Sequence, residues 1–92
     1  MAKRIIGITR SQGEYQGVKF DKWIFYVIEE EKSERAFAGE VTGTFKVKNN
    51  QLRDVFRGLV TSENDLADLI GRRCVVMYDE YKNPQLIDML DD

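Results

Sequence analysis

The sequence predicts one small, mainly β domain spanning residues 1–92, and three observations support this. The chain has 92 residues, enough for one hydrophobic core and too few for two. Hydrophobic residues make up 42% of the chain and charged residues 33%, which is typical of a folded soluble domain. Apolar and polar residues alternate over long stretches, as they do in strands that have one face in a core.

Two strands are expected in the first third of the chain. In residues 3–10 the side chains alternate in a pattern that would place them in turn on the two faces of a strand, so we expect a strand there. Residues 11–17 contain two glycines among polar residues, so we expect a loop there. Residues 18–29 are rich in aromatic and β-branched side chains, which favours a long second strand. The run 30–34 is highly charged and is expected to be a turn.

The third expected strand has the clearest pattern. From Phe37 to Lys48, the odd positions are apolar or glycine and the even positions are mostly polar. Alternation over this length predicts a strand with one face in the core and the other in water. Gly39 and Gly43 are expected at bends or bulges, which a tightly curved sheet requires.

The next segment has a helical pattern. Within 51–59, apolar residues recur at helical spacing, namely at Leu52, Val55, Phe56 and Leu59. Ser62, with Asp65 three residues later, is expected to begin a second short helix, and Gly71 is placed to end it.

Two further strands complete the domain. They are expected at 72–81 and 85–90, with a turn at 82–84. The resulting order, β-β-β-α-β-β, is that of the OB-fold, a five-stranded, partly open barrel. An SH3-like barrel and an α+β sheet with a helix on one face are the alternatives. The end of the chain, Asp88 to Asp92, is short and acidic.

The residue content argues against an enzyme. The chain has no histidine, so the usual general base and the commonest metal ligand are missing. Cys74 is followed by Val75, Val76 and Met77, which predicts a buried thiol rather than a nucleophile. Neither a phosphate-binding glycine motif nor a calcium loop is present. We therefore expect a non-catalytic binding module without a cofactor or a metal.

The chain is expected to be cytoplasmic and to have no membrane partner. No apolar run approaches the ~20 residues that a membrane span needs, and the start lacks the apolar stretch of a signal peptide. A single cysteine cannot form an internal disulfide, which agrees with a reducing compartment.

Charge is unevenly distributed along the chain. The net charge is −2, whereas nucleic-acid-binding domains are commonly basic. Residues 1–28 contain five basic and two acidic residues, and residues 49–92 contain five basic and nine acidic residues. The N-terminal part of the chain is thus basic, and the C-terminal part is acidic.

The second strand offers a stacking surface, but both of its faces are apolar. The set from Phe20 to Ile28 at even positions is more uniformly aliphatic, so we expect it to face inward. Trp23 and Phe25 would then lie outside, where flat rings and lysines together can hold a single strand. The candidate nucleic-acid-binding residues are Arg10, Tyr15, Lys19, Trp23, Phe25, Thr44, Lys46 and Lys48. The alternatives are that Trp23 belongs to the core or that the aromatic surface is a dimer interface.

Two stretches carry a resemblance to a known family. They are Gly13-Glu14-Tyr15-Gln16-Gly17 with Phe20-Asp21 and Phe25-Tyr26-Val27, and Leu69-Ile70-Gly71-Arg72-Arg73 with Val75-Val76-Met77-Tyr78-Asp79-Glu80-Tyr81. In the arrangement of these two stretches, the chain resembles the small single-stranded DNA-binding proteins of phages, plasmids and conjugative elements. The resemblance implies an OB-fold homodimer or higher assembly that coats transient single strands with little sequence preference.

Two functional hypotheses follow. The first is a sequence-tolerant single-stranded DNA-binding protein of a phage or mobile element, with RNA left open as the ligand and with replication or transfer proteins as partners. The second is a protein-interaction subunit of a phage or mobile-element assembly, in which the same aromatic face buries against another chain.

Overall fold

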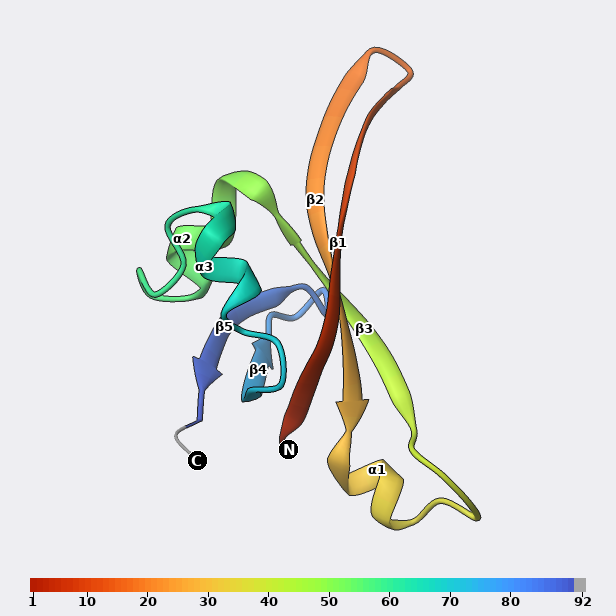
Figure 1. The fold of residues 1–92 in the computed structure, drawn as a ribbon. Coiled ribbons are helices and arrows are strands. Elements are labelled where there is room, and N and C mark those ends of the chain that lie inside the picture. Colours follow the sequence, from red (N-terminus) through yellow and green to blue (C-terminus); the bar gives the residue numbers. More distant parts are fainter. Residues whose placement is uncertain (91–92) are drawn as a thin grey trace.

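In the computed structural model, which describes residues 1–90, the chain forms one antiparallel sheet and a few short helices (Figure 1). Asp91 and Asp92 of the predicted acidic end lie outside the described residues. The elements are β1 (Lys3–Tyr15), β2 (Val18–Glu29), α1 (Glu30–Glu34), β3 (Thr42–Lys48), a 3₁₀ turn (Asn49–Gln51), α2 (Leu52–Val55), α3 (Glu63–Ala67), β4 (Arg73–Tyr78) and β5 (Pro84–Met89).

The sheet has the strand order β3-β2-β1-β4-β5, and every pairing is antiparallel. This confirms the predicted mainly β class with five strands, and α2 and α3 lie between the third and fourth strands as expected. The sheet is open, because no ladder joins its edge strands β3 and β5 within residues 1–90. No helix in that part of the chain is long and apolar enough to cross a membrane.

The prediction of a loop at 11–17 is wrong. Strand β1 continues to Tyr15 and pairs with β2 along its whole length. A two-residue turn joins the strands, and both of its residues, Gln16 and Gly17, have positive φ (52° and 79°). Positive φ at both central residues is the condition for a type I′ turn, whose twist matches that of the flanking strands. The distal parts of this hairpin, residues 11–15 and 18–22, project beyond the helices in Figure 1, and we call them the arm.

The third strand begins later than expected. Its alternation is confirmed from Thr42 onward, but Phe37 belongs to a loop and is fully exposed. The reason is the lack of a partner: the β2–β3 ladder ends at Ile28 and Thr42, and β2 gives way at Glu30 to the short helix α1 instead of the expected turn.

The helical segment is also shorter than its pattern. Leu52, Val55 and Phe56 are buried as predicted, but Leu59 is 62% exposed because α2 ends at Val55 and the chain turns away at Arg57, which has a φ of 55°. Gly71 has a φ of 86°, but it does not end the second helix as expected, because α3 ends at Ala67 and residues 68–71 form turns.

The capping pattern differs from the prediction in one detail. The Asp65 carboxylate accepts hydrogen bonds from the backbone N–H and the hydroxyl of Thr61 (2.9 and 3.0 Å), and the Ser62 side chain makes no capping bond. The Thr61 backbone N–H, ahead of the hydroxyl, lowers the pKa of Asp65.

The fourth strand ends at Tyr78, three residues earlier than expected. The Asp79 carboxylate accepts hydrogen bonds from the backbone N–H groups of Tyr81 and Asn83, both at 2.9 Å. These bonds replace ladder bonds and close the β4–β5 turn.

Candidate nucleic-acid interface

The inner face of β2 holds the residues that were expected on its outer face. Phe25 and Val27 are fully buried, and Trp23 is 9% exposed. Phe25 stacks on Phe45 with ring centroids 4.8 Å apart and also contacts Phe56. The predicted orientation of β2 is therefore wrong, and the Trp23 and Phe25 rings are not available to stack on bases.

Two contacts hold the Trp23 ring in place, one at its N–H group and one over its face. Its indole N–H donates to the Asn49 side-chain oxygen at 2.8 Å, which satisfies the one polar atom of the ring. The Arg10 guanidinium lies over the ring, 4.9 Å from its centroid. Both contacts fix the ring as part of the inner face.

Arg10 itself is committed to ion pairs. It pairs with Asp21 at 2.8 Å and with Glu63, so it joins β1, β2 and α3. The hydrogen bond with Asp21 is the main cause that raises the pKa of Arg10, and the same bond lowers the pKa of Asp21. A cation with two carboxylate partners is poorly placed to bind a phosphate, and Lys19 lies on this same side of the arm, opposite Glu14.

The other side of β2 and β3 forms an exposed surface, which we call the outer face. It consists of Phe20, Lys22, Ile24 and Tyr26 on β2 and of Thr42, Thr44, Lys46 and Lys48 on β3. Thr44, Lys46 and Lys48 are exposed there, as expected from their alternation. Tyr15, at the end of the arm, is 70% exposed and opposite Val18, on the same side as Phe20.

Within strands β2 and β3, the positive charge on the outer face has no counter-charge. Lys22 and Lys48 are directly opposite each other across the β2–β3 ladder, and Lys46 is opposite Ile24. The outer positions of these two strands hold no Asp or Glu, and none of the three lysines forms an ion pair within residues 1–90. Like charges directly opposite across a sheet are destabilising, so the fold gains nothing from this arrangement.

Two aromatic rings lie among these lysines. Phe20 is 39% exposed and lies against Gly13, where an added Cβ would come within 2.7 Å of the ring. The Lys22 ammonium lies 5.6 Å from the centre of the same ring. Tyr26 is 38% exposed, and its hydroxyl is 3.2 Å from the Thr9 hydroxyl. Both rings are thus partly supported by the sheet and partly open to solvent.

The outer face continues across the open seam of the sheet to the β4–β5 turn. A hollow of about 220 Å³ lies between Thr44 and Lys46 on one side and Tyr78 and Lys82 on the other. Asp54 and Asp79 line a neighbouring hollow with Lys46 and Lys48, and the Asp79 carboxylate accepts hydrogen bonds from the turn.

A larger groove of about 850 Å³ lies where the arm meets the end of β3. Its lining includes Val18, Phe20, Lys22, Lys48 and Asn50. One aromatic ring, that of Phe20, and the ammonium groups of Lys22 and Lys48 therefore line one groove, which also includes Lys19 and Asp21 from the other side of the arm.

The exposure of Lys22 and Tyr26 was not predicted from the sequence. Both parities of β2 are apolar, and a one-residue slip exchanges the two faces. The signal lay in the central part of the strand, where the odd positions Trp23, Phe25 and Val27 carry no charge, while the even positions include an ammonium group and a phenol.

The described residues contain neither a metal-ligand cluster nor an accessible thiol. They hold no group of three or more side chains suited to a metal ion. Cys74 is fully buried, as predicted, and burial raises its pKa to about 11, so the thiol stays protonated at neutral pH.

Comparison of the chain with protein-family models, with curated proteins and with solved structures found no match. The function must therefore be inferred from the chain's own geometry and chemistry.

Proposed function

We propose that this protein binds single-stranded DNA, without catalysis and with little sequence preference, through the outer face of β2 and β3. The observation that supports this best is the opposed pair Lys22 and Lys48, beside Lys46, on strand positions that hold no carboxylate. Such a cluster is unfavourable in the free protein and becomes favourable when an anion bridges it. The phosphates of a nucleic acid are anions with a regular spacing that suits a row of lysines.

The rings between the lysines favour a single strand over a duplex. Phe20 and Tyr26 present partly open faces on which unstacked bases can lie. In a duplex the bases are stacked on each other, so these rings would contribute little. Tyr78 and Lys82 extend the same chemistry across the seam.

The proposal agrees with the resemblance to small single-stranded DNA-binding proteins of phages, plasmids and conjugative elements. The strand order fits an OB-type sheet that is open between β3 and β5. The homodimer, the replication or transfer partners and the cytoplasmic location stay predictions, as does the absence of catalysis.

The test is a fluorescence anisotropy titration of a labelled ~30-mer oligothymidine at low salt, with the corresponding duplex as competitor. We expect saturable binding of the single strand and at least ~10-fold weaker binding of the duplex. The double variant Lys22→Ala/Lys48→Ala should lose most of this affinity.

A matched control distinguishes the effect on binding of the lysines' position from the effect of the net charge that is removed. Lys32→Ala/Arg53→Ala removes the same net charge from exposed positions outside strands β2 and β3 and should bind nearly as well as the parent. Equal losses in the two double variants, or no binding by the parent, would reject the proposed face. In the latter case the protein-interaction hypothesis becomes the stronger one.

A further inference from the structure

The hollow between β3 and the β4–β5 turn, which we call the seam hollow, has no acidic residue in its lining. Lys46 lines it from β3 and Lys82 from the turn, and neither lysine forms an ion pair within residues 1–90. Thr44, Tyr78 and Asn83 add neutral groups that can donate hydrogen bonds. At about 220 Å³ the hollow is smaller than the ~300–1,000 Å³ of sites for drug-sized ligands, so it suits a small anionic group.

The carboxylates of this region belong to other places. Asp54 and Asp79 line the adjacent hollow with Lys46 and Lys48. The Asp79 carboxylate accepts two hydrogen bonds from backbone N–H groups of the turn, both at 2.9 Å. Glu80, the next residue of the turn, lines neither hollow. Two ammonium groups therefore meet at the seam hollow without a carboxylate in its lining.

The β4–β5 turn holds Lys82 in a conformation that suits glycine or asparagine better. Its φ is 64°, in the left-handed region that strains most side chains. The turn is closed at Asp79, whose C=O accepts the Lys82 N–H at 3.0 Å and whose N–H donates to the Asn83 C=O at 2.9 Å. These bonds fix the point from which the Lys82 side chain leaves the backbone. The fold gains nothing from a lysine at this position, which points to a role for its ammonium group in binding.

The open edge of β3 adds backbone donors to the same place. The Glu29 N–H donates to the Val41 C=O at 2.8 Å, and in an antiparallel ladder only alternate residues bond to the partner strand. The N–H groups of Thr44 and Lys46 therefore face away from β2, toward the seam, where no strand pairs with them. Phosphate oxygens accept hydrogen bonds from backbone N–H and ammonium groups alike.

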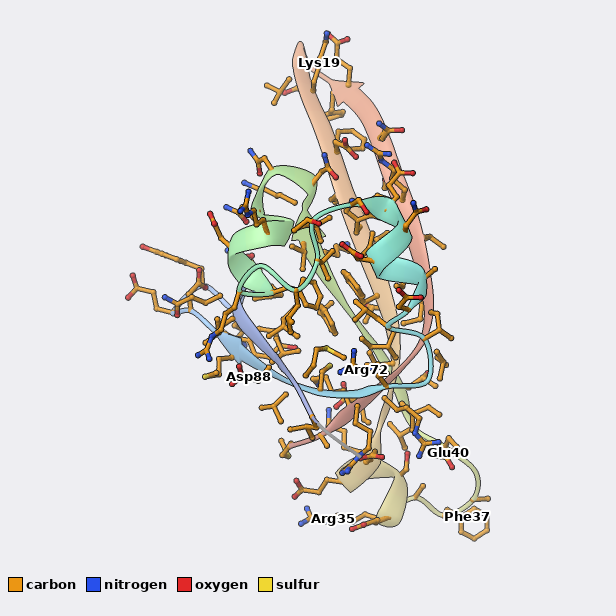
Figure 2. The ribbon with its side chains drawn as sticks, turned by 60° about the vertical axis from the view of Figure 1, so that its left-hand side comes forward. Lys19, Arg35, Phe37, Glu40, Arg72 and Asp88 are labelled. Atoms are coloured by element: carbon orange, nitrogen blue, oxygen red, sulfur yellow. The ribbon has the colours of Figure 1, made fainter. Side chains whose placement is uncertain are left out.

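The seam hollow is separate from the groove at the arm. Figure 2 shows the β4–β5 turn (light blue, at the left) away from Lys19 at the tip of the arm and from Phe37 in the loop before β3. The hollow meets the outer face at Thr44 and Lys46. A single strand on the outer face can therefore enter the hollow without passing the arm.

We propose that the seam hollow binds one phosphate group of a single strand between Lys46 and Lys82, and that this phosphate joins β3 to the β4–β5 turn. The inference rests on the proposed function, because the hollow continues the outer face. No ladder joins the two edges in the free protein. A phosphodiester has two free oxygens, one for each side of the seam, so the bound strand closes the sheet.

A double-mutant cycle tests whether the two lysines hold the same phosphate. Asparagine tolerates the left-handed conformation better than most residues, so Lys82→Asn removes the ammonium group and keeps the turn. We expect Lys46→Ala and Lys82→Asn each to weaken oligothymidine binding roughly 10-fold at low salt, and the double variant to weaken it by no more than about 30-fold. The double variant should also lower the salt dependence of binding by about 0.7, the value for one phosphate.

Independent contacts would give a different result. Losses that multiply to roughly 100-fold, or a fall in salt dependence of about 1.4, would mean two separate phosphates and overturn the shared site. Lys32→Asn removes one positive charge from an exposed position on α1 and should bind like the parent. An equal loss in this control would assign the effect of Lys82→Asn to net charge and overturn the site as well.

Amide hydrogen exchange tests the closing of the seam. With saturating oligothymidine, the N–H groups of Thr44 and Lys46 should exchange at least ~10-fold more slowly than in the free parent. Lys82→Asn, saturated with the same oligonucleotide, should lose most of this protection. Equal protection in parent and variant would mean that the strand covers β3 without the turn, and would overturn the closing.

Two outcomes separate this inference from the proposed function. If Lys22→Ala/Lys48→Ala loses affinity for oligothymidine and Lys82→Asn does not, only the seam site is wrong. The second outcome uses thymidine 3′,5′-bisphosphate as a probe. If the parent binds no oligothymidine, but this probe protects the Thr44 and Lys46 amides in the parent and not in Lys82→Asn, the proposed function is wrong and the hollow is still a phosphate site.

Discussion

The two faces of β2 carry aromatic residues in equal number but in different surroundings. Trp23 and Phe25 lie on the inner face, where every polar atom of their rings is satisfied and Phe25 stacks on Phe45. Phe20 and Tyr26 lie on the outer face, where they are partly open and stand among lysines that lack counter-charges. Aromatic residues alone therefore do not distinguish a core from a binding surface, whereas uncompensated charge around them does.

The largest effect expected from this comparison is on stability. Phe25→Ala should lower the free energy of unfolding by about 3–5 kcal/mol, because it leaves a cavity between Phe45 and Phe56. Tyr26→Ala, on the opposite face of the same strand, should lower it by less than about 1 kcal/mol. Urea denaturation followed by circular dichroism measures both, and similar losses would erase the difference between the two faces.

The second effect is on oligothymidine binding, where the outer face of β2 should matter more than the inner face. Tyr26→Ala should weaken binding of oligothymidine by about 1–3 kcal/mol, the usual contribution of one stacked base. Tyr26→Phe keeps the ring, removes only the contact with the Thr9 hydroxyl, and should bind almost like the parent. Anisotropy titrations decide this, and a Phe variant as weak as the Ala variant would exclude stacking as the role of the ring.

A smaller effect concerns the end of β2, outside both faces. The hydrogen bond from Arg73 at 2.7 Å, supported by Arg4, lowers the pKa of Glu30 below its usual value of 4.5. A lowered folded-state pKa contributes stability above the unfolded-state value, and this contribution is lost as the pH falls through the folded-state value. Glu30→Gln should thus cost about 0.2–1 kcal/mol at pH 7 and almost nothing well below pH 4.5. Urea denaturation across this pH range checks it, and a cost independent of pH would assign the effect to packing.

The smallest effect is a gain in stability. Lys48→Ala removes the repulsion with Lys22 and should raise the free energy of unfolding by a few tenths of a kcal/mol at low salt. The gain should vanish at high salt, while the salt dependence of oligothymidine binding should fall by about 0.7. If the variant is less stable at low salt, Lys48 serves the fold, and the argument for an anion site at this pair fails.

Much of the fold was predictable because its signals are local. Alternation predicted β3 from Thr42 onward, and helical spacing predicted the burial of Leu52, Val55 and Phe56. The length of the hairpin was not predictable from composition, because residues 11–15 are polar and owe their strand conformation to the partner strand and the turn at Gln16 and Gly17.

The candidate site was predictable only on β3, where one parity is polar. Thr44, Lys46 and Lys48 were placed correctly on the exposed side. On β2 both parities are apolar, and the choice depends on whether Trp23 or Tyr26 meets Phe45 and the helices, which is a tertiary fact. The ion pairs of Arg10 could not be predicted either, because its partners Asp21 and Glu63 come from distant parts of the chain.

The most direct test of the outer face is ultraviolet cross-linking of the protein to oligothymidine, followed by mass spectrometry of the peptides. Bases stacked on a ring lie close enough to form covalent bonds with it on irradiation. The cross-links should fall on Phe20 or Tyr26. Cross-links on Trp23 or Phe25, from the inner face of the same strand, would contradict the assignment, as would a pattern confined to residues outside the arm, β2, β3 and the β4–β5 turn.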